Sequence, residues 1–454
     1  MDLINDKIIG DLLAKTKTPD DHQLGEILQK AQEGKGLDLP DVATLLKIKK
    51  AEQRERLYGL AQQIKQSIYG TRMVLFAPIY LSNDCVNSCT YCGFSLTNIK
   101  LLRKTLSVDE AVDEARVLVS KGQKRILVVC GENQAHTTPG YVAKVMEGMY
   151  KDSGIRRINV NMAPQSTEGF KVLKEAGIGT YQLFQETYHR ATYDRVHQAG
   201  PKKDYLWRLC SYDRAFEAGI DDLGFGVLFG LYDYRFEVLA LLQHIQSFEK
   251  KYGVGPHTIS LPRWRPASGA LLKEAPYPVG DDEFADIVAI LRLAVPYTGI
   301  ILSTRETAEL RNRLFSLGVS QISAGSCTSP GGYKEKEFGS GQFQIDDVRS
   351  VEEIVMELLN SGFLPSFCTA CYRRERTGRD FMALAKTGAI KSMCQANAIL
   401  TFKEYLLDNS SPQTRMLGEV CLLGEISKIA EGSMKTWVLD RLCQLNKGSR
   451  DLYF

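Results

Sequence analysis

The sequence has 454 residues, and no apolar run in it is long enough to span a lipid bilayer, so it is not expected to encode an integral membrane protein. Its first residues, MDLINDKIIG, carry acidic side chains and no apolar h-region, so we expect no signal peptide and a cytoplasmic location. The formal net charge is only +3, which gives no argument for a nucleic-acid partner. Structural disulfides are not expected, because the eleven cysteines are an odd number in a chain without an export signal.

The pattern of apolar residues predicts an α/β protein. A content of 44% hydrophobic and 24% charged residues suits a globular chain with a large core. After a helical start, eight β-branched runs are each followed by a helix-length segment, which predicts a closed (β/α)8 barrel of the TIM type. An open doubly wound sheet is the alternative, but no G-x-G-x-x-G follows the first run. The eight runs are residues 74–82, 125–132, 157–164, 180–186, 222–230, 257–262, 299–306 and 320–326.

We expect three regions along the chain. Residues 1–70 form an N-terminal helical extension, because apolar residues recur there at intervals of three and four. Residues 71–345 form the barrel. Residues 346–454 form a C-terminal domain of helices and loops without further strands.

The first group of cysteines lies in NDCVNSCTYCGFS, where Cys85, Cys89 and Cys92 are spaced C-x3-C-x2-C. It follows the first predicted strand, on the barrel face where active sites of this fold are built. Three thiolates can hold three irons of a 4Fe–4S cluster, which leaves the fourth iron open to another ligand. A structural zinc ion with a distant fourth ligand is the alternative.

The second group lies near the C-terminus, where Cys368, Cys371 and Cys394 are spaced C-x2-C-x22-C. It is again one ligand short of four. Cations such as Arg376 stand close to it in the sequence and suit an anionic cluster. We therefore expect a second iron–sulfur cluster, with one zinc ion and a borrowed histidine as the alternative.

The first group, with Tyr91 before its last cysteine, resembles that of the radical S-adenosylmethionine superfamily. The resemblance implies that the open iron binds S-adenosylmethionine and that an electron from the cluster then yields a 5′-deoxyadenosyl radical. The segment CGE, which ends in Glu132, resembles the superfamily's contact to the methionine amino group.

A barrel of this kind followed by C-x2-C-x22-C resembles the HydG family, the tyrosine lyases that mature FeFe-hydrogenase. The resemblance covers roughly residues 70–410, and the segments that carry it are GTYQLFQETYHRATY, GIDDLGFGVLFGLYDYRFEVL, GPHTISLPR, VPYTGIILSTRE and CTACYRRERTG. One departure is Ala396, where the family has proline, and we expect only a small effect on stability.

This resemblance implies a two-step reaction. The radical abstracts hydrogen from the amino group of L-tyrosine, and the Cα–Cβ bond breaks to give p-cresol and dehydroglycine. Dehydroglycine then becomes carbon monoxide and cyanide near the second 4Fe–4S cluster, whose additional labile iron collects them. The implied partners are a reductant such as flavodoxin or ferredoxin and a hydrogenase maturation scaffold protein.

Several residues suit these roles. Arg305 offers a planar fork for the tyrosine carboxylate, and Ser303 and Ser323 offer hydroxyl donors beside it. His257 starts the sixth strand run and should face the opposite end of the barrel, and the family resemblance makes it the ligand of the labile iron. The expected contacts to S-adenosylmethionine are Tyr91, Glu132, Asn161, Glu186, Tyr188 and Arg263.

Other functions remain open. A different radical enzyme on the same barrel, such as the thiamine-pathway tyrosine lyase (2-iminoacetate synthase) or an aminomutase-like enzyme, would leave no role for the second cysteine group. A non-catalytic iron–sulfur carrier or scaffold would bind clusters without cleaving S-adenosylmethionine.

Overall fold

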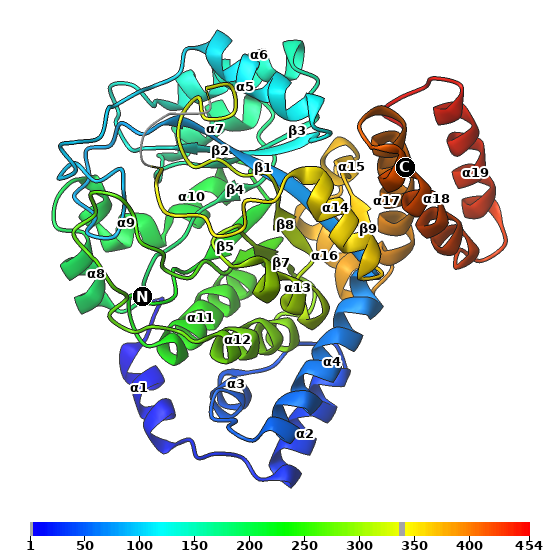
Figure 1. The fold of residues 1–454 in the computed structure, drawn as a ribbon. Helices are drawn as coiled ribbons and strands as arrows, with labels where there is room; N and C mark the ends of the chain where they lie inside the picture. The colour runs from blue at the N-terminus through cyan, green and yellow to red at the C-terminus, as the bar shows by residue number, and fades with distance from the viewer. Residues whose placement is uncertain (1–2, 336–340) are drawn as a thin grey trace.

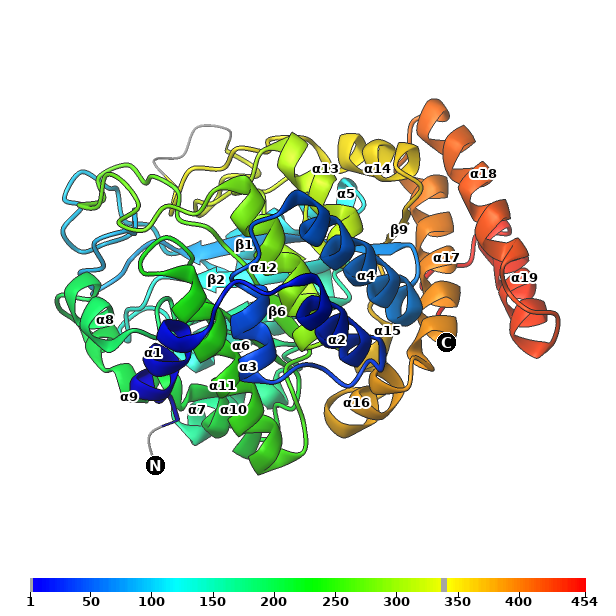
Figure 2. The ribbon, with the colours of Figure 1, turned by 90° about the horizontal axis from the view of Figure 1, so that it is seen from below.

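The N-terminal residues form helices that lie against the outside of the barrel (Figures 1 and 2). The structure, a computed structural model, describes residues 3–335 and 341–454. In this extension α4 packs on α12 (Asp281–Ala294), and α1 and α3 pack on α11 (Tyr234–Tyr252). The four helices are α1 (Asp6–Lys15), α2 (Asp21–Gln32), α3 (Leu39–Leu45) and α4 (Ala51–Tyr69).

Eight parallel strands close into a barrel, which confirms the expected (β/α)8 fold (Figure 1). Closure is made by β1, which pairs with both β2 and β8. This strand is buried along nearly its whole length, as a parallel strand covered on both faces must be. The strands are β1 (Arg72–Ser82), β2 (Arg125–Cys130), β3 (Arg157–Asn161), β4 (Tyr181–Gln182), β5 (Leu223–Gly226), β6 (Thr258–Ser260), β7 (Gly299–Leu302) and β8 (Gln321–Ser323).

Helices follow the strands and cover the outside of the barrel. The first of them begins at Ser107, whose hydroxyl accepts the backbone N–H of Glu110 while the Glu110 carboxylate accepts the backbone N–H of Ser107. None of the described helices has the length and apolar character that a membrane span requires. Besides α11 and α12, these elements are α5 (Val108–Ser120), α6 (Pro139–Asp152), α7 (Thr167–Glu175), α8 (Arg190–Val196), the 3-10 turn η1 (Pro201–Lys203), α9 (Tyr205–Leu209), α10 (Ser211–Glu217) and α13 (Ala308–Leu317).

The C-terminal region contains a strand that the sequence analysis did not expect. Strand β9 (Leu364–Ser366) pairs with the start of β1, so the prediction of no further strands after residue 346 was wrong. Its three residues include a proline, which an edge strand tolerates. The helices are α14 (Val351–Asn360), α15 (Ala370–Arg373), α16 (Gly378–Lys386), α17 (Ile390–Asp408), α18 (Pro412–Ser427) and α19 (Ser433–Asn446), with α18 and α19 packed on α17.

The pairing of β9 decides where the second cysteine group lies. Arg72 and Val74, near the start of β1, stand opposite Leu364 and Ser366 of β9. Cys368 and Cys371 follow two and five residues later, so they lie near the end of the barrel where the strands begin. The loop with the first cysteines follows β1 and lies at the opposite end.

Candidate active site

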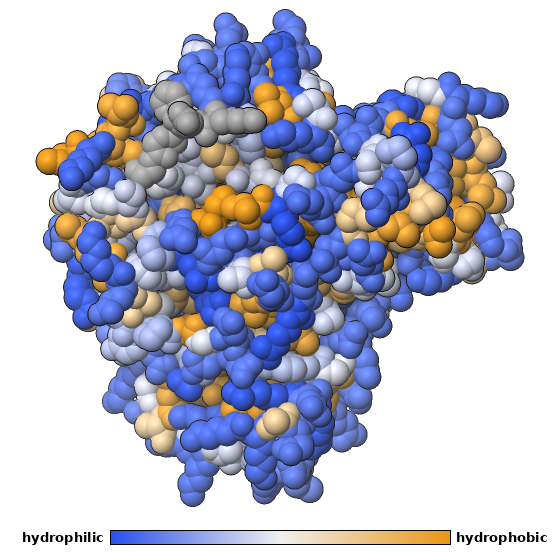
Figure 3. All heavy atoms as spheres, in the orientation of Figure 1, coloured by the Kyte–Doolittle hydropathy of each residue, from blue (hydrophilic) through white to orange (hydrophobic). Residues whose placement is uncertain are grey.

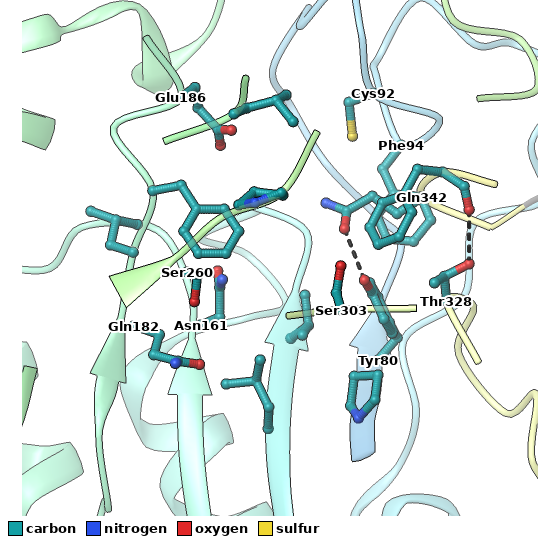
Figure 4. Close-up of a pocket in the computed structure, with 18 of the residues that line it drawn as sticks. Tyr80, Cys92, Phe94, Asn161, Gln182, Glu186, Ser260, Ser303, Thr328 and Gln342 are labelled. Atoms are coloured by element: carbon teal, nitrogen blue, oxygen red, sulfur yellow. Dashed lines mark hydrogen bonds between the residues drawn. The ribbon is translucent and has the colours of Figure 1, made fainter. Parts of the chain in front are cut away.

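A large cavity opens at the carboxyl ends of the barrel strands (Figure 4). It encloses about 1410 Å³ of space, its open mouth included. Cysteines of the first group line it, and Figure 4 shows Cys92 above the ends of the strands and Ser303 below it.

The first three cysteines form one group in the structure. Cys85, Cys89 and Cys92 all line the cavity. Burial, followed by the electrostatic influence of Cys85, raises the pKa of Cys92 to about 11, and burial also raises the pKa of Cys89. The uncharged thiol is therefore favoured at neutral pH until a metal replaces the proton.

The cavity wall supplies three of the ligands that a cluster needs. In a 4Fe–4S cluster each thiolate binds a different iron, so three cysteines on one wall leave the fourth iron open to a ligand in the cavity. A structural zinc ion would need a fourth protein ligand in addition.

The end of β2 supports the cysteine loop. A Cβ atom at Gly131 would stand 2.4 Å from the backbone oxygen of Asp84, so only glycine lets the strand pass so close to the loop. The backbone oxygen of Glu132 accepts the N–H of Val86 at 2.8 Å, and its carboxylate accepts the side-chain amide of Asn87 at 2.6 Å. Glu132 lines the cavity, as expected of a cofactor contact.

Glu186 is a charged group held at the cavity wall. Its backbone has φ 73°, a conformation rarely adopted by residues other than glycine. Lys202 and Arg208 approach its Oε1 at 2.6 and 3.2 Å. Burial by itself opposes the charge, but these two cations hold the pKa of Glu186 below its ordinary value. Neither cation was singled out from the sequence, because they become neighbours of Glu186 only through the fold.

Arg305 is a cation without an anionic partner. Its guanidinium lies over the ring of Phe343, 3.2 Å from the centroid, and lines the cavity. Among the described residues its side chain makes no ion pair or hydrogen bond, whereas Arg265 beside it pairs with Glu306 at 2.9 Å. Burial lowers the pKa of Arg305 to about 10, so it stays charged at neutral pH. It is thus available to a carboxylate ligand.

Most of the other predicted contacts reach the cavity. Ser303, Ser323, Asn161 and Tyr91 line it. The Ser323 hydroxyl also accepts the backbone N–H of Thr304 at 3.1 Å. Figure 4 shows Asn161 at the end of its strand beside Gln182 and Ser260, two polar residues that the sequence analysis missed.

Two of the predicted contacts, Tyr188 and Arg263, do not line the cavity in this structure. Tyr188 is fully buried, and its hydroxyl lies 3.0 Å from Nδ1 of His244 on α11, because the turn at Glu186 directs it toward the helical layer. Arg263 donates from Nε to Glu306 at 2.9 Å and pairs with Asp281 at 2.8 Å, so its charge is already matched. The arginine that reaches the cavity is Arg265, two residues further on.

The second cysteine group lies at the other end of the barrel, where Cys394 is buried and Cys368 and Cys371 are partly buried. Burial raises the pKa of Cys371 to about 12, with further contributions from Cys394 and Cys368. The pKa of Cys394 is raised as well, first by burial, against the opposing charge of Arg72. The fold has thus brought a cysteine of α17 next to the C-x2-C pair.

Arginines surround this second group. Three of them, Arg72, Arg125 and Arg157, are the first residues of β1, β2 and β3. The Nε atoms of Arg72, Arg125 and Arg376 are buried without a hydrogen-bond partner. Such a concentration of positive charge fits an anionic, thiolate-bound metal group at this end of the barrel. The sequence already indicated this concentration of arginines, because each of these three strands begins with arginine.

His257 lies at the same end of the barrel, directly before β6. Its Nδ1 stands 2.7 Å from Oδ2 of Asp222, and its ring stacks on Phe381 of α16 with centroids 3.9 Å apart. Burial lowers the pKa of His257 against the opposing effect of Asp222. Although these atoms are close, Nδ1 of His257 and the carboxylate oxygens of Asp222 are buried without a hydrogen-bond partner. A carboxylate facing one ring nitrogen, with the other free for a metal, is the usual surrounding of a metal-binding histidine.

Small and polar side chains lie inside the barrel between the two ends. Gln182, which lines the cavity, approaches the hydroxyl of Thr258 next to His257, with 3.4 Å between donor and acceptor. A Cβ atom at Gly224 would meet both of these side chains, at 2.5 and 2.7 Å. Gln321 accepts a hydrogen bond from Arg125 at 3.1 Å. The barrel interior is therefore polar where branched apolar layers are usual.

Comparisons with known proteins agree with this architecture. The Radical SAM superfamily matches residues 79–244, and the Biotin and Thiamin Synthesis associated domain matches residues 260–364. The 2-iminoacetate synthase of Escherichia coli (strain K12) is 32% identical over 340 residues, which are 74% of this chain and 89% of that protein. With the closed barrel and the cysteine loop after β1, these matches define the chain as a radical S-adenosylmethionine enzyme.

Two solved structures identify the family within this class of enzymes. A crystal structure of HydG, a maturase of the [FeFe]-hydrogenase, is 46% identical, covers 100% of both chains and superimposes with a TM-score of 0.96. HydG from Carboxydothermus hydrogenoformans is 42% identical over 96% of both chains, with a TM-score of 0.84. The chain belongs to the HydG family of hydrogenase maturases.

Proposed function

We propose that this protein cleaves L-tyrosine into p-cresol and dehydroglycine at its first site and forms carbon monoxide and cyanide at its second. The observation that carries the proposal is the presence of two separate cysteine triplets at opposite ends of one barrel. A 2-iminoacetate synthase on the same barrel would need only the first. The products would serve the assembly of the [FeFe]-hydrogenase active site, in line with the similarity of the chain to two maturases of that enzyme.

The cavity offers distinct places for the cofactor and for tyrosine. Cys85, Cys89 and Cys92 would hold the first cluster, with Glu132 and Asn161 placed to contact S-adenosylmethionine. When bound, the cluster and S-adenosylmethionine supply the radical that removes hydrogen from the substrate. The chain's own part is to orient the groups around that radical and to exclude water.

Tyrosine would bind through its carboxylate to Arg305. The guanidinium already lies over the ring of Phe343 and lines the cavity, so little rotamer entropy would be lost on binding. Ser303 and Ser323 would fix the same carboxylate or the amino group. Phe76 and Leu127 of the cavity lining offer apolar surface to the phenol ring.

The second step needs no additional atoms. Dehydroglycine, HN=CH–COOH, contains the atoms of one HCN, one CO and one water. Its nitrogen is bonded to Cα, so Cα becomes the cyanide carbon and the carboxyl carbon becomes carbon monoxide. The arginines at the strand starts would bind dehydroglycine, as its carboxylate, in preference to neutral molecules. The polar interior of the barrel lies between the two sites. Cys368, Cys371, Cys394 and His257 would hold the second cluster and its labile iron.

The test uses anaerobically reconstituted protein with dithionite, S-adenosylmethionine and tyrosine that carries ¹³C at either the carboxyl carbon or Cα. We expect p-cresol from both samples, labelled carbon monoxide from the first and labelled cyanide from the second. Formation of p-cresol without either diatomic product would assign the chain to the thiamine-type reaction. An absence of any S-adenosylmethionine cleavage would favour a non-catalytic cluster carrier.

A further inference from the structure

The loop that follows the first cysteines presents apolar side chains to solvent. Leu96, Ile99 and Leu102 are 54%, 90% and 79% exposed. Leu101, in the middle of the same loop, is only 8% exposed and belongs to an apolar cluster against which Cys85 and Cys92 pack. The loop is thus a thin wall, with the first cysteine group on its inner side and an apolar surface on its outer side.

Hydrogen bonds fix the loop that carries this exposed surface. Arg103 donates to the backbone oxygens of Asn83, Phe94 and Ser95 at 2.7–2.8 Å, which ties the two ends of the loop together. The side-chain amide of Asn98 donates to Gly93 at 2.8 Å and across to Ser268 at 3.0 Å. Because the loop is fixed, its apolar side chains stay exposed to water, which is unfavourable in free energy. Contact with another molecule would bury them and remove this unfavourable term.

Neighbouring loops extend the surface. The backbone N–H of Leu272 donates to Thr90 at 2.7 Å, which places Leu271, 52% exposed, beside the cysteine loop. Figure 3 shows apolar atoms gathered at the left edge of the molecule, over the loop that follows β1 in Figure 1. We call the surface of Leu96, Ile99, Leu102 and Leu271 the loop patch.

The charged residues within the loop of the patch are all basic. Residues 93–107 include Lys100, Arg103 and Lys104 and no acidic residue. Lys104 pairs with Glu110 and Glu335 from outside this segment, at 3.4 and 3.5 Å. Lys100 is exposed, and no ion pair to it is found among the described residues. An apolar centre with an exposed lysine at its rim is complementary to a protein surface with an apolar centre and acidic residues.

The position of the patch selects the kind of partner. The first cluster needs electrons from outside the chain, and Cys89 is buried. Leu101 belongs to the apolar cluster against which Cys85 and Cys92 pack, and it is followed directly by Leu102 of the patch. We propose that the loop patch is the docking surface for a small acidic one-electron carrier protein, which reduces the first cluster through this loop.

The proposal rests on the first cluster of the proposed function and not on tyrosine chemistry. Its test therefore follows cluster reduction rather than product formation. Holoenzyme is mixed with flavodoxin hydroquinone or with dithionite, and the reduced-cluster EPR signal is timed by freeze-quench. The change of that signal on addition of S-adenosylmethionine marks the first cluster, so the readout holds even if tyrosine proves not to be the substrate.

The variants are Ile99→Asp and Lys100→Glu, with Leu423→Asp as the matched control. Leu423 is 68% exposed on α18, far along the chain and in a separate apolar stripe with Met416 and Val420. We expect reduction by flavodoxin to slow by about tenfold or more in the first two variants, while reduction by dithionite and the iron content stay unchanged. Added salt should slow the wild-type reaction with flavodoxin and have less effect on Lys100→Glu.

Two results would overturn the proposal. One is an unchanged rate with flavodoxin in Lys100→Glu and Ile99→Asp. The other is a loss of flavodoxin reduction in Leu423→Asp alone, which would place the docking surface on α18. Should Ile99→Asp lose iron, Lys100→Glu decides the question by itself, because Lys100 makes no side-chain contact that the fold depends on.

Discussion

The tyrosine site can be tested most sharply at Arg305. Its guanidinium lies 3.2 Å from the centroid of the Phe343 ring and has no acceptor among the described residues, so its donors remain free for a ligand. Lysine would keep the positive charge but would lose both the two-pronged contact and the stacking. A hydrogen bond to a charged group contributes about 1.5–3 kcal/mol, so Arg305→Lys should weaken tyrosine binding by roughly 10- to 150-fold.

The assay is the tyrosine concentration that gives half-maximal formation of p-cresol, measured at saturating S-adenosylmethionine, together with tyrosine binding by equilibrium dialysis. Arg265→Lys is the matched control, since Arg265 lines the same cavity but pairs with Glu306 at 2.9 Å. It should change tyrosine binding far less. Equal affinities for tyrosine in wild type and Arg305→Lys would refute the reasoning and move the carboxylate site elsewhere.

Three further changes have defined outcomes. Gly131→Ala should displace the cysteine loop, because its Cβ would stand 2.4 Å from the backbone oxygen of Asp84, and iron analysis should show loss of the first cluster; full iron content would contradict this. His257→Ala should keep p-cresol formation and both clusters but lose the additional iron, measured as iron per chain and by EPR; an unchanged iron count would exclude it as a ligand. Lys65→Met should stabilise the fold by about 1–3 kcal/mol at pH 8, because Lys65 Nζ is buried with no hydrogen-bond partner and burial lowers its pKa to about 7. Unfolded Lys65 binds a proton that the folded chain lacks between pH 7 and about 10.4, so wild-type stability should rise with pH in that window and the variant's should not; parallel denaturation midpoints across this range would contradict the assignment.

The barrel was predictable from the sequence because its strands are apolar runs separated by amphipathic helices. Strand β9 was missed, because three residues with a proline carry no periodic signal and its pairing with β1 is set by tertiary contacts. The cysteine triplets were predictable as well, since ligand spacing is a local property. The position of Cys394 beside Cys371 required the packing of α17, which no local pattern specifies.

Contacts at the ends of strands were harder to predict. Arg263 and Arg265 differ by two residues, and only the fold shows that Glu306 pairs with both while Arg265 alone lines the cavity. Tyr188 stands two residues after Glu186, whose φ is positive, and its hydroxyl meets His244 rather than the cavity. By contrast, the arginines that begin β1, β2 and β3 were visible in the sequence, but their meaning depended on which end of the barrel the second cysteine group would occupy.

The central claim is that the two cysteine triplets serve two separable steps at opposite ends of one barrel. The most direct measurement quantifies p-cresol and carbon monoxide side by side in wild type, Cys89→Ala and Cys394→Ser, each reconstituted with iron and sulfide. We expect Cys89→Ala to make neither product, because two thiolates do not hold the first cluster. Cys394→Ser should keep most of the p-cresol and lose most of the carbon monoxide. If Cys394→Ser lost p-cresol as completely as Cys89→Ala, the two triplets would not be independent sites and the two-step account would be contradicted.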